Sequence, residues 1–76
     1  MRMNAETMKR NGIVYAAIKE LLSLELTATP EMISHFTDSV YNEKDVKKAV
    51  TSLEKANLVT VGGMGYVTEI HPFPEA

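Results

Sequence analysis

The sequence predicts a small α+β fold that is mostly helical, with three helices followed by a short β-hairpin. Three observations support this prediction: apolar residues recur at helical spacing in three segments, capping residues precede these segments, and a glycine-rich turn separates two β-branched runs near the C-terminus. The 76 residues suit a single domain, 1–76, with a thin hydrophobic core. We expect this core to span about residues 13–70, with residues 71–76 as an extended tail.

The first helix is predicted over residues 5–24, with Asn4 as its N-cap. Its apolar face consists of Val14, Ala17, Ile18, Leu21 and Leu22. Gly12 weakens the middle of this helix by about 1 kcal/mol relative to alanine. Two interpretations therefore stay open: residues 1–10 extend the helix, or the helix begins at Asn11 and residues 1–10 form an arm.

The second and third helices have clear starts. Thr29 is a good N-cap and Pro30 suits the first helical position, so the second helix should begin there. The third helix is predicted over about residues 42–56, with Asn42 as its cap and Asn57 as a left-handed residue beyond its end. Its buried stripe consists of Val46, Ala49, Val50 and Leu53.

The glycines of residues 56–70, ANLVTVGGMGYVTEI, allow either a phosphate-binding loop or a hairpin. A phosphate loop needs a helix after its glycines and a lysine with a hydroxyl in the pattern GxxxxGK[ST]. Here the glycines are followed by Tyr66, Val67 and Thr68, and the chain has no Gly-Lys pair. Glycines between two β-branched runs favour a two-stranded hairpin.

Residues 44–68, KDVKKAVTSLEKANLVTVGGMGYVT, resemble the second half of winged helix-turn-helix domains. In that family an amphipathic third helix ends in a Leu-Glu-Lys/Arg-Ala-Gly-Leu-Val phrase and runs into a β-hairpin wing. Residues 53–59, LEKANLV, match the phrase, with Asn57 where glycine is usual. By size the chain is similar to small transcription regulators of viruses, plasmids and bacterial operons. The resemblance implies a winged-helix fold whose third helix enters the major groove of DNA.

Two features depart from the family pattern. The link between the second and third helices is longer than in a strict helix-turn-helix, and the tip of the hairpin carries no lysine or arginine. The resemblance therefore places DNA binding on the third helix rather than on the wing.

The exposed side of the third helix carries the candidate DNA-binding residues. At 100° per residue, Lys44, Lys48, Thr51 and Lys55 fall together opposite the buried stripe, and Lys47 flanks them. Four of the eight basic residues lie in this helix. Lysine can reach phosphates or guanine edges, and threonine can contact a phosphate or a thymine methyl group. The candidates are Asn42, Lys44, Lys47, Lys48, Thr51 and Lys55. A merely solvated helix face gives the same pattern, so this interpretation also stays open.

Several other classes of protein do not fit the sequence. The chain has no cysteine, and neither His35 nor His71 has further ligands at metal-binding spacing. It has no nucleophile motif and no cofactor fingerprint, so we expect no enzyme, no cofactor and no metal. No apolar run approaches the ~20 residues of a membrane span, and no signal peptide is present, so we expect a cytoplasmic protein without membrane association.

Two hypotheses of function follow. In the first, the chain is a sequence-specific transcription regulator that binds double-stranded DNA, as a homodimer with one third helix in each of two successive major grooves. Met1, Met3 and Met8 would supply an adaptable dimer surface, although a core position stays open for one of them. In the second, the chain is a winged-helix module that binds a protein partner and does not contact DNA. The net charge of −2, the uncharged hairpin tip and the methionine-rich start favour the second hypothesis. The lysines and the resemblance to small regulators favour the first.

Overall fold

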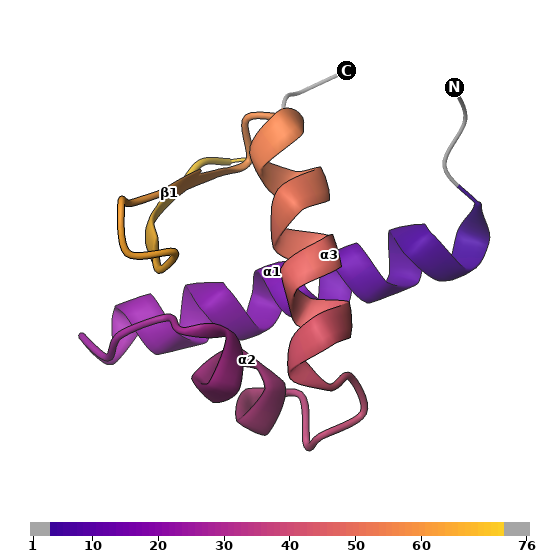
Figure 1. The fold of residues 1–76 in the computed structure, drawn as a ribbon, viewed down its shortest axis with the longest axis horizontal. Helices are drawn as coiled ribbons and strands as arrows, with labels where there is room; N and C mark the ends of the chain where they lie inside the picture. Colours follow the sequence, from indigo (N-terminus) through magenta and orange to yellow (C-terminus); the bar gives the residue numbers. More distant parts are fainter. Residues whose placement is uncertain (1–3, 73–76) are drawn as a thin grey trace.

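The computed structural model describes residues 4–72, and its elements follow the predicted order. The elements are α1 (Ala5–Ser23), α2 (Pro30–Phe36), α3 (Glu43–Lys55), β1 (Val59–Val61) and β2 (Val67–Ile70). Figure 1 shows α3 crossing α1, with α2 below the crossing and the hairpin beside the C-terminal half of α3. The predicted α+β fold of three helices and an antiparallel hairpin is confirmed. The suggested packing of Met1 and Met3 and the tail beyond Pro72 fall outside the described residues.

Side-chain caps fix the start of each helix, as the sequence predicts. Asn4 accepts a hydrogen bond from the Thr7 amide at 2.7 Å, so α1 begins at Ala5 and runs without a break through Gly12. Thr29 and Asn42 cap the other two helices in the same way, through bonds of 3.1 and 2.9 Å to backbone amides. Each cap satisfies one of the backbone donors that a helix start leaves unpaired.

All three helices end in the same turn, although no glycine follows any of them. After α1, the Leu26 amide bonds back to the Leu21 carbonyl at 2.9 Å, and Glu25 has a φ of 59°. After α3, the amide of Leu58 bonds to the Leu53 carbonyl at 2.9 Å, with Asn57 at a φ of 60°. This is the Schellman motif, which usually places glycine at the left-handed position. The prediction of a left-handed Asn57 is confirmed.

The link between α2 and α3 is held by its own side chains. Asp38 and Ser39 both have positive φ, at 56° and 59°, and so turn the chain sharply after α2. Ser34 donates a hydrogen bond to the Tyr41 carbonyl at 2.6 Å, and the buried Thr37 donates to the Ser34 carbonyl at 2.7 Å. These bonds define the long link between the two helices, a link whose geometry the sequence pattern does not predict.

The hairpin is antiparallel, and its second strand makes one contact that the sequence analysis missed. Val59 pairs with Ile70 and Thr60 with Glu69, and the register then shifts so that Val61 faces Val67. The turn closes through a bond from the Gly65 amide to the Gly62 carbonyl at 3.0 Å, with Gly65 at a φ of 81°. On its other side, Val67 forms an isolated bridge with Ala28, which lies just before α2. The glycines therefore belong to a hairpin, as predicted.

One hydrophobic core joins every element. The predicted stripe of α3 is buried in full, and Tyr41 packs against the core as partly buried cover. The largest fully buried side chains come from all three helices: Val14, Ile18, Leu21, Ile33 and Val46. The last residues of the described chain are fastened to this core, because Tyr15 donates its hydroxyl hydrogen bond to the His71 carbonyl. The core thus fixes the orientation of α3 and the hairpin, on which the candidate site lies.

Candidate functional site

The lysines of α3 are all exposed, but they divide between two sides of the helix. Lys44, Lys48 and Lys55 fall within an arc of about 40° at 100° per residue, opposite the buried stripe. We call these three lysines the basic face. Lys47 lies about 80° away from its centre, on the side toward the hairpin, where it lines a groove with Thr51.

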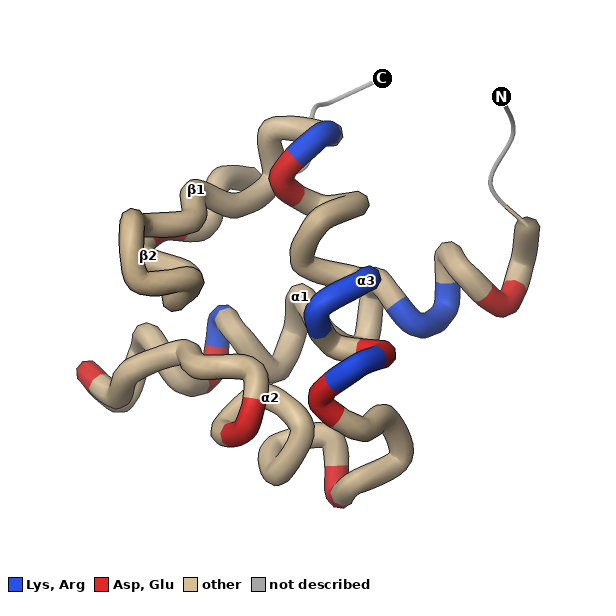
Figure 2. Tube along the Cα trace, in the orientation of Figure 1, with Lys and Arg blue, Asp and Glu red and all other residues tan. Residues whose placement is uncertain are grey.

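A hydrogen-bonded chain of side chains brings an arginine of α1 beside the basic face. Arg10 donates from Nε and Nη2 to the Asn11 side-chain oxygen at 3.1 and 3.0 Å. The Asn11 side-chain amide in turn donates to the Ser52 hydroxyl on α3 at 3.0 Å. Ser52 lies one turn from both Lys48 and Lys55, so the Arg10 guanidinium extends the basic face onto α1. Figure 2 shows this basic segment of α1 next to the middle of α3.

The polar group that makes this contact, the Asn11 side chain, was not among the predicted site residues. Asn11 is only 6% exposed and lies in line with the apolar face of α1, one turn before Val14 and Tyr15. A polar residue within an apolar helical stripe is the pattern that identifies it, because a buried amide needs hydrogen-bond partners. The same region also carries acids: Glu6 and Asp45 line a hollow of about 400 Å³ together with Lys9 and Arg10. The positive surface therefore ends at this hollow.

Two of the polar candidates have structural hydrogen bonds. The Asn42 side chain accepts from the Asp45 amide as the cap of α3. The Thr51 hydroxyl donates to the Lys47 carbonyl at 2.9 Å, one turn earlier in the same helix. Both side chains are exposed, so each keeps one side open to solvent.

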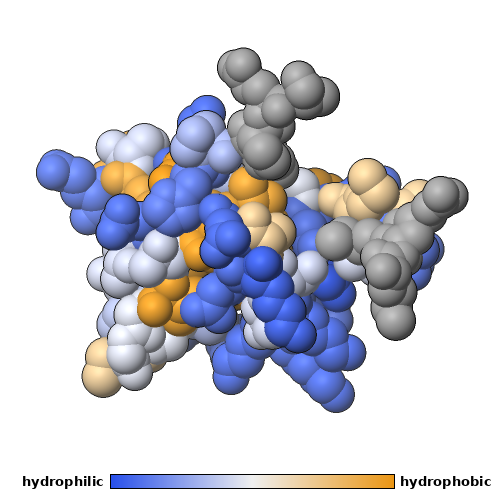
Figure 3. All heavy atoms as spheres, turned by 90° about the horizontal axis from the view of Figure 1, so that it is seen from above, coloured by the Kyte–Doolittle hydropathy of each residue, from blue (hydrophilic) through white to orange (hydrophobic). Residues whose placement is uncertain are grey.

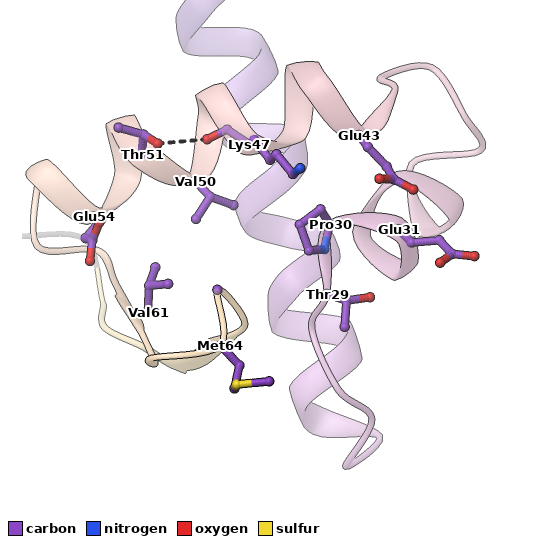
Figure 4. A pocket seen from close by; sticks show the side chains of 11 residues that line it. Thr29, Pro30, Glu31, Glu43, Lys47, Val50, Thr51, Glu54, Val61 and Met64 are labelled. Carbon is purple, nitrogen blue, oxygen red and sulfur yellow. Dashed lines mark hydrogen bonds between the residues drawn. The ribbon is translucent and has the colours of Figure 1, made fainter.

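A groove lies between α3, the start of α2 and the hairpin (Figure 4). Its volume is about 650 Å³. Val50 of α3 and Val61 of β1 point toward each other across it, and Met64 extends from the hairpin turn. Glu54 lies at the end nearest the strand, whereas Glu31 and Glu43 lie at the opposite end, beyond Pro30. The groove therefore has an apolar floor and carboxylates at both ends.

The half of the molecule that contains the groove and the hairpin also has hydrophobic residues at its surface. Figure 3 shows orange atoms among hydrophilic side chains on the half that carries the hairpin. Among the large hydrophobic side chains, Met64 is 79% exposed and Tyr66 is 39% exposed. The half of the molecule with the hairpin thus differs in chemistry from the basic face.

The hairpin hydroxyls are occupied within the hairpin. Thr68 donates to the Thr60 carbonyl at 3.2 Å, and the Thr60 hydroxyl is 2.8 Å from the His71 Nε2. The tip, from Gly62 to Gly65, has no charged side chain. The hairpin tip therefore offers no ionic group that could neutralise a phosphate.

Within residues 4–72, no cluster of three or more His, Asp or Glu side chains is arranged to hold a metal ion. In the same described part of the chain, no helix has the length and apolar character needed to cross a membrane. Comparison of the chain with protein-family models, with curated proteins and with solved structures finds no match.

Proposed function

We propose that this chain is a winged helix-turn-helix transcription regulator that binds double-stranded DNA through the basic face of α3. The observation that carries the proposal is the alignment of Lys44, Lys48 and Lys55 on one exposed side of a rigid helix, with Arg10 held beside them. Lysine and arginine neutralise phosphates and release counterions, which supplies most of the affinity of small modules for DNA.

The hydrogen bonds of Arg10 support its part in this surface. A guanidinium whose orientation is already fixed loses less conformational freedom when it binds a phosphate than a free side chain does. Asn11 accepts two of its N–H groups, which leaves other donors of the planar fork free to face a phosphate. Arg10 would thus contact the DNA backbone next to the groove that α3 enters.

The charge of the groove sets the direction from which DNA approaches. Three carboxylates and one ammonium line the groove, and this balance repels phosphate. DNA would therefore meet α3 on the side of Arg10 and Lys48, away from the hairpin. Lys47 and Thr51, which line the groove, would contribute less to DNA binding than the basic face does.

A homodimer belongs to the same proposal. One module of this size covers about 600–1,000 Å² of its own surface on DNA, which limits the specificity of a single copy. Met8 is 61% exposed on α1, so it is available to a second copy rather than part of the core. Sedimentation equilibrium tests this part: we expect a mass of two chains that Met8→Lys shifts toward one, and a wild-type mass of one chain would contradict it.

Fluorescence anisotropy with a labelled duplex, measured over a salt series, tests DNA binding. If about four phosphates are neutralised, the log–log slope of affinity against salt should be about −3.6. Lys48→Glu should weaken binding by at least tenfold and make the slope shallower by about 1 to 2. Lys19→Glu is the matched control, because it makes the same charge change at an exposed position of α1 outside the basic face.

The outcomes of this experiment are distinct. A large effect of Lys48→Glu with little effect of Lys19→Glu supports the basic face as the DNA surface. Equal effects of the two variants would reduce the binding to non-specific attraction by net charge. Absence of binding at low salt would overturn the proposal.

A further inference from the structure

The groove between α2, α3 and the hairpin has the chemistry of a peptide-binding site rather than of a DNA-binding surface. Its floor is apolar, formed by Val50, Val61 and Pro30 with Met64 at the edge. Its carboxylates come from two different helices and stand at opposite ends. Among the described residues that line the groove, Lys47 is the one cation, and it lies between the two acidic ends. This arrangement fits a segment that is cationic at its ends and hydrophobic, without charge, in its middle.

The spacing of the carboxylates defines that segment further. Glu43 and Glu54 are eleven positions apart on α3, which places their Cα atoms about 16 Å apart along the helix axis. An extended chain covers that distance in about five residues at 3.3 Å per residue. A volume of about 650 Å³ holds a few side chains, and segments this short do not form stable helices by themselves.

We propose that this groove binds a short, extended basic segment of another protein, with two cationic side chains four or six residues apart and apolar residues between them, an even spacing that puts them on one face of the extended chain. One cation would face Glu54, and the other would face Glu43 and Glu31. The apolar side chains would contact Val61 and the exposed Met64, which is unbranched and adapts to ligands of irregular shape. This inference goes beyond DNA binding and does not depend on it.

A second copy of this chain fits the groove less well. Its exposed lysines on α1, Lys9 and Lys19, are about 15 Å apart along the axis, but they belong to a helix and not to an extended segment. A contact between the groove of one copy and α1 of the next would also be heterologous, and such contacts build open chains unless the rotation closes a ring. The extended shape of the groove's ligand and the symmetry of such a contact therefore favour a different protein.

Titration of the ¹⁵N-labelled protein with a defined probe tests the proposal. The probe is the blocked heptapeptide Arg-Ser-Leu-Ser-Leu-Ser-Arg, whose arginines and leucines share one face of an extended chain, and the control peptide has glutamate in place of both arginines. We expect saturable changes in the amide signals of Glu54, Val61, Met64 and Gly65 with the arginine peptide, and at least tenfold weaker binding of the glutamate peptide. No saturable change at millimolar peptide, or changes centred on Lys48 and Lys55, would overturn the proposal.

Matched variants of the protein separate groove binding from general attraction. Glu43→Gln/Glu54→Gln should weaken binding of the arginine peptide by about three- to tenfold, since each exposed ion pair contributes modestly. Glu20→Gln/Glu69→Gln makes the same charge change outside the groove and should alter the affinity by less than twofold. Equal losses in the two double variants would contradict the assignment of the groove.

A third variant guards against failure of the double variant to fold. Met64→Ser changes an exposed side chain of the turn and leaves the charges in place, so it should keep the fold while lowering the affinity. An unchanged affinity in Met64→Ser, with a native circular dichroism spectrum, would count against the apolar floor. Because these titrations contain no DNA, their outcome is independent of the Lys48→Glu experiment.

Discussion

The two exposed sides of α3 differ in charge although they belong to one helix of 13 residues. One side carries Lys44, Lys48 and Lys55 and is joined by Arg10 of α1. The other carries Glu43 and Glu54 with Lys47 between them, and it is joined by Glu31 of α2. The same helix thus separates its charges by helical period, and each neighbouring helix adds a residue of the matching sign.

This difference shows why the net charge of the chain is a poor guide to its partners. The formal charge of −2 is a sum over the whole chain and hides a basic face on one side of α3 and a groove with an excess of carboxylates on the other. If both of our proposals hold, one small protein would join DNA to a basic segment of another protein. Variants that change one surface and leave the other intact measure how far the basic face and the groove depend on one another.

The largest effect on stability is expected at the buried side of α3, which packs into the core and so positions both the basic face and the groove. Leu53 is 3% exposed and lies on the buried side of α3, between the two exposed sides. Leu53→Ala should lower the free energy of unfolding by about 2–5 kcal/mol through lost burial and the cavity left behind. Urea unfolding measures this loss, and both DNA binding and peptide binding should fall together.

Leu53→Met is the control for this change, because it keeps the hydrophobic volume and should cost less than about 1.5 kcal/mol. If Leu53→Ala removed one binding activity and left the other intact, the two surfaces would not share this support.

A smaller effect is expected at the contact that joins Arg10 to the basic face. Asn11→Ala removes the acceptor of the Arg10 guanidinium and the donor to Ser52, both in a buried setting. We expect a loss of about 1–3 kcal/mol in the free energy of unfolding. DNA affinity should fall several-fold under conditions where the protein remains folded, whereas peptide affinity should not change.

Arg10→Gln is the companion to this variant. It should lower DNA affinity and make the salt slope shallower by about 1, with little effect on stability. Unchanged DNA binding in both variants would remove Arg10 from the interface.

The sequence predicts the elements well because their signals are local. Each helix start has a side chain that caps it, and the hairpin has glycines between β-branched runs, so Asn4, Thr29 and Asn42 give the starts correctly. The buried stripe of α3 also follows from its helical period alone. By contrast, the alternative in which α1 begins at Asn11, suggested by Gly12, is wrong, because α1 begins at Ala5. Burial of the surrounding helix face outweighs the low helix propensity of one glycine.

The features that the sequence did not predict depend on contacts between distant residues. The bridge from Ala28 to Val67 joins positions 39 residues apart, and Asn11 meets Ser52 across 41 positions. The helical period predicts that Lys47 flanks the other lysines of α3, but not that it lines a groove, because the groove depends on where the hairpin packs beside α3. The left-handed conformations at Glu25, Asp38 and Ser39 were not predicted either, because none of these residues is a glycine, the usual sequence signal for such a turn.

Substitutions of Asn42 can distinguish its structural role as the cap of α3 from a role in DNA binding. Asn42→Ala removes the cap of α3 and should lower the free energy of unfolding by about 1 kcal/mol, measured by thermal or urea unfolding. Asn42→Ser keeps a side-chain oxygen for the Asp45 amide, so its stability should stay close to that of the wild type. If Asn42 acts only as a cap, Asn42→Ser also keeps the wild-type affinity for DNA; a clear loss of affinity in this stable variant would make Asn42 a DNA contact.

The smallest effect is expected at a position remote from both sides of α3. Glu25 is exposed and adopts a φ of 59° at the end of α1, a conformation that glycine adopts without the steric cost of a Cβ. Glu25→Gly should therefore raise the free energy of unfolding by about 0.5–1 kcal/mol, after the larger entropy of glycine in the unfolded chain is subtracted. That gain corresponds to a rise of about 2–8 °C in Tm for a domain of this size. Glu25→Ala keeps the Cβ and removes the same charge, so it should give no such rise. Because Glu25 lines neither the groove nor the basic face, both binding affinities should stay unchanged while Tm rises; a change in either affinity would show that the end of α1 is coupled to a binding surface of α3.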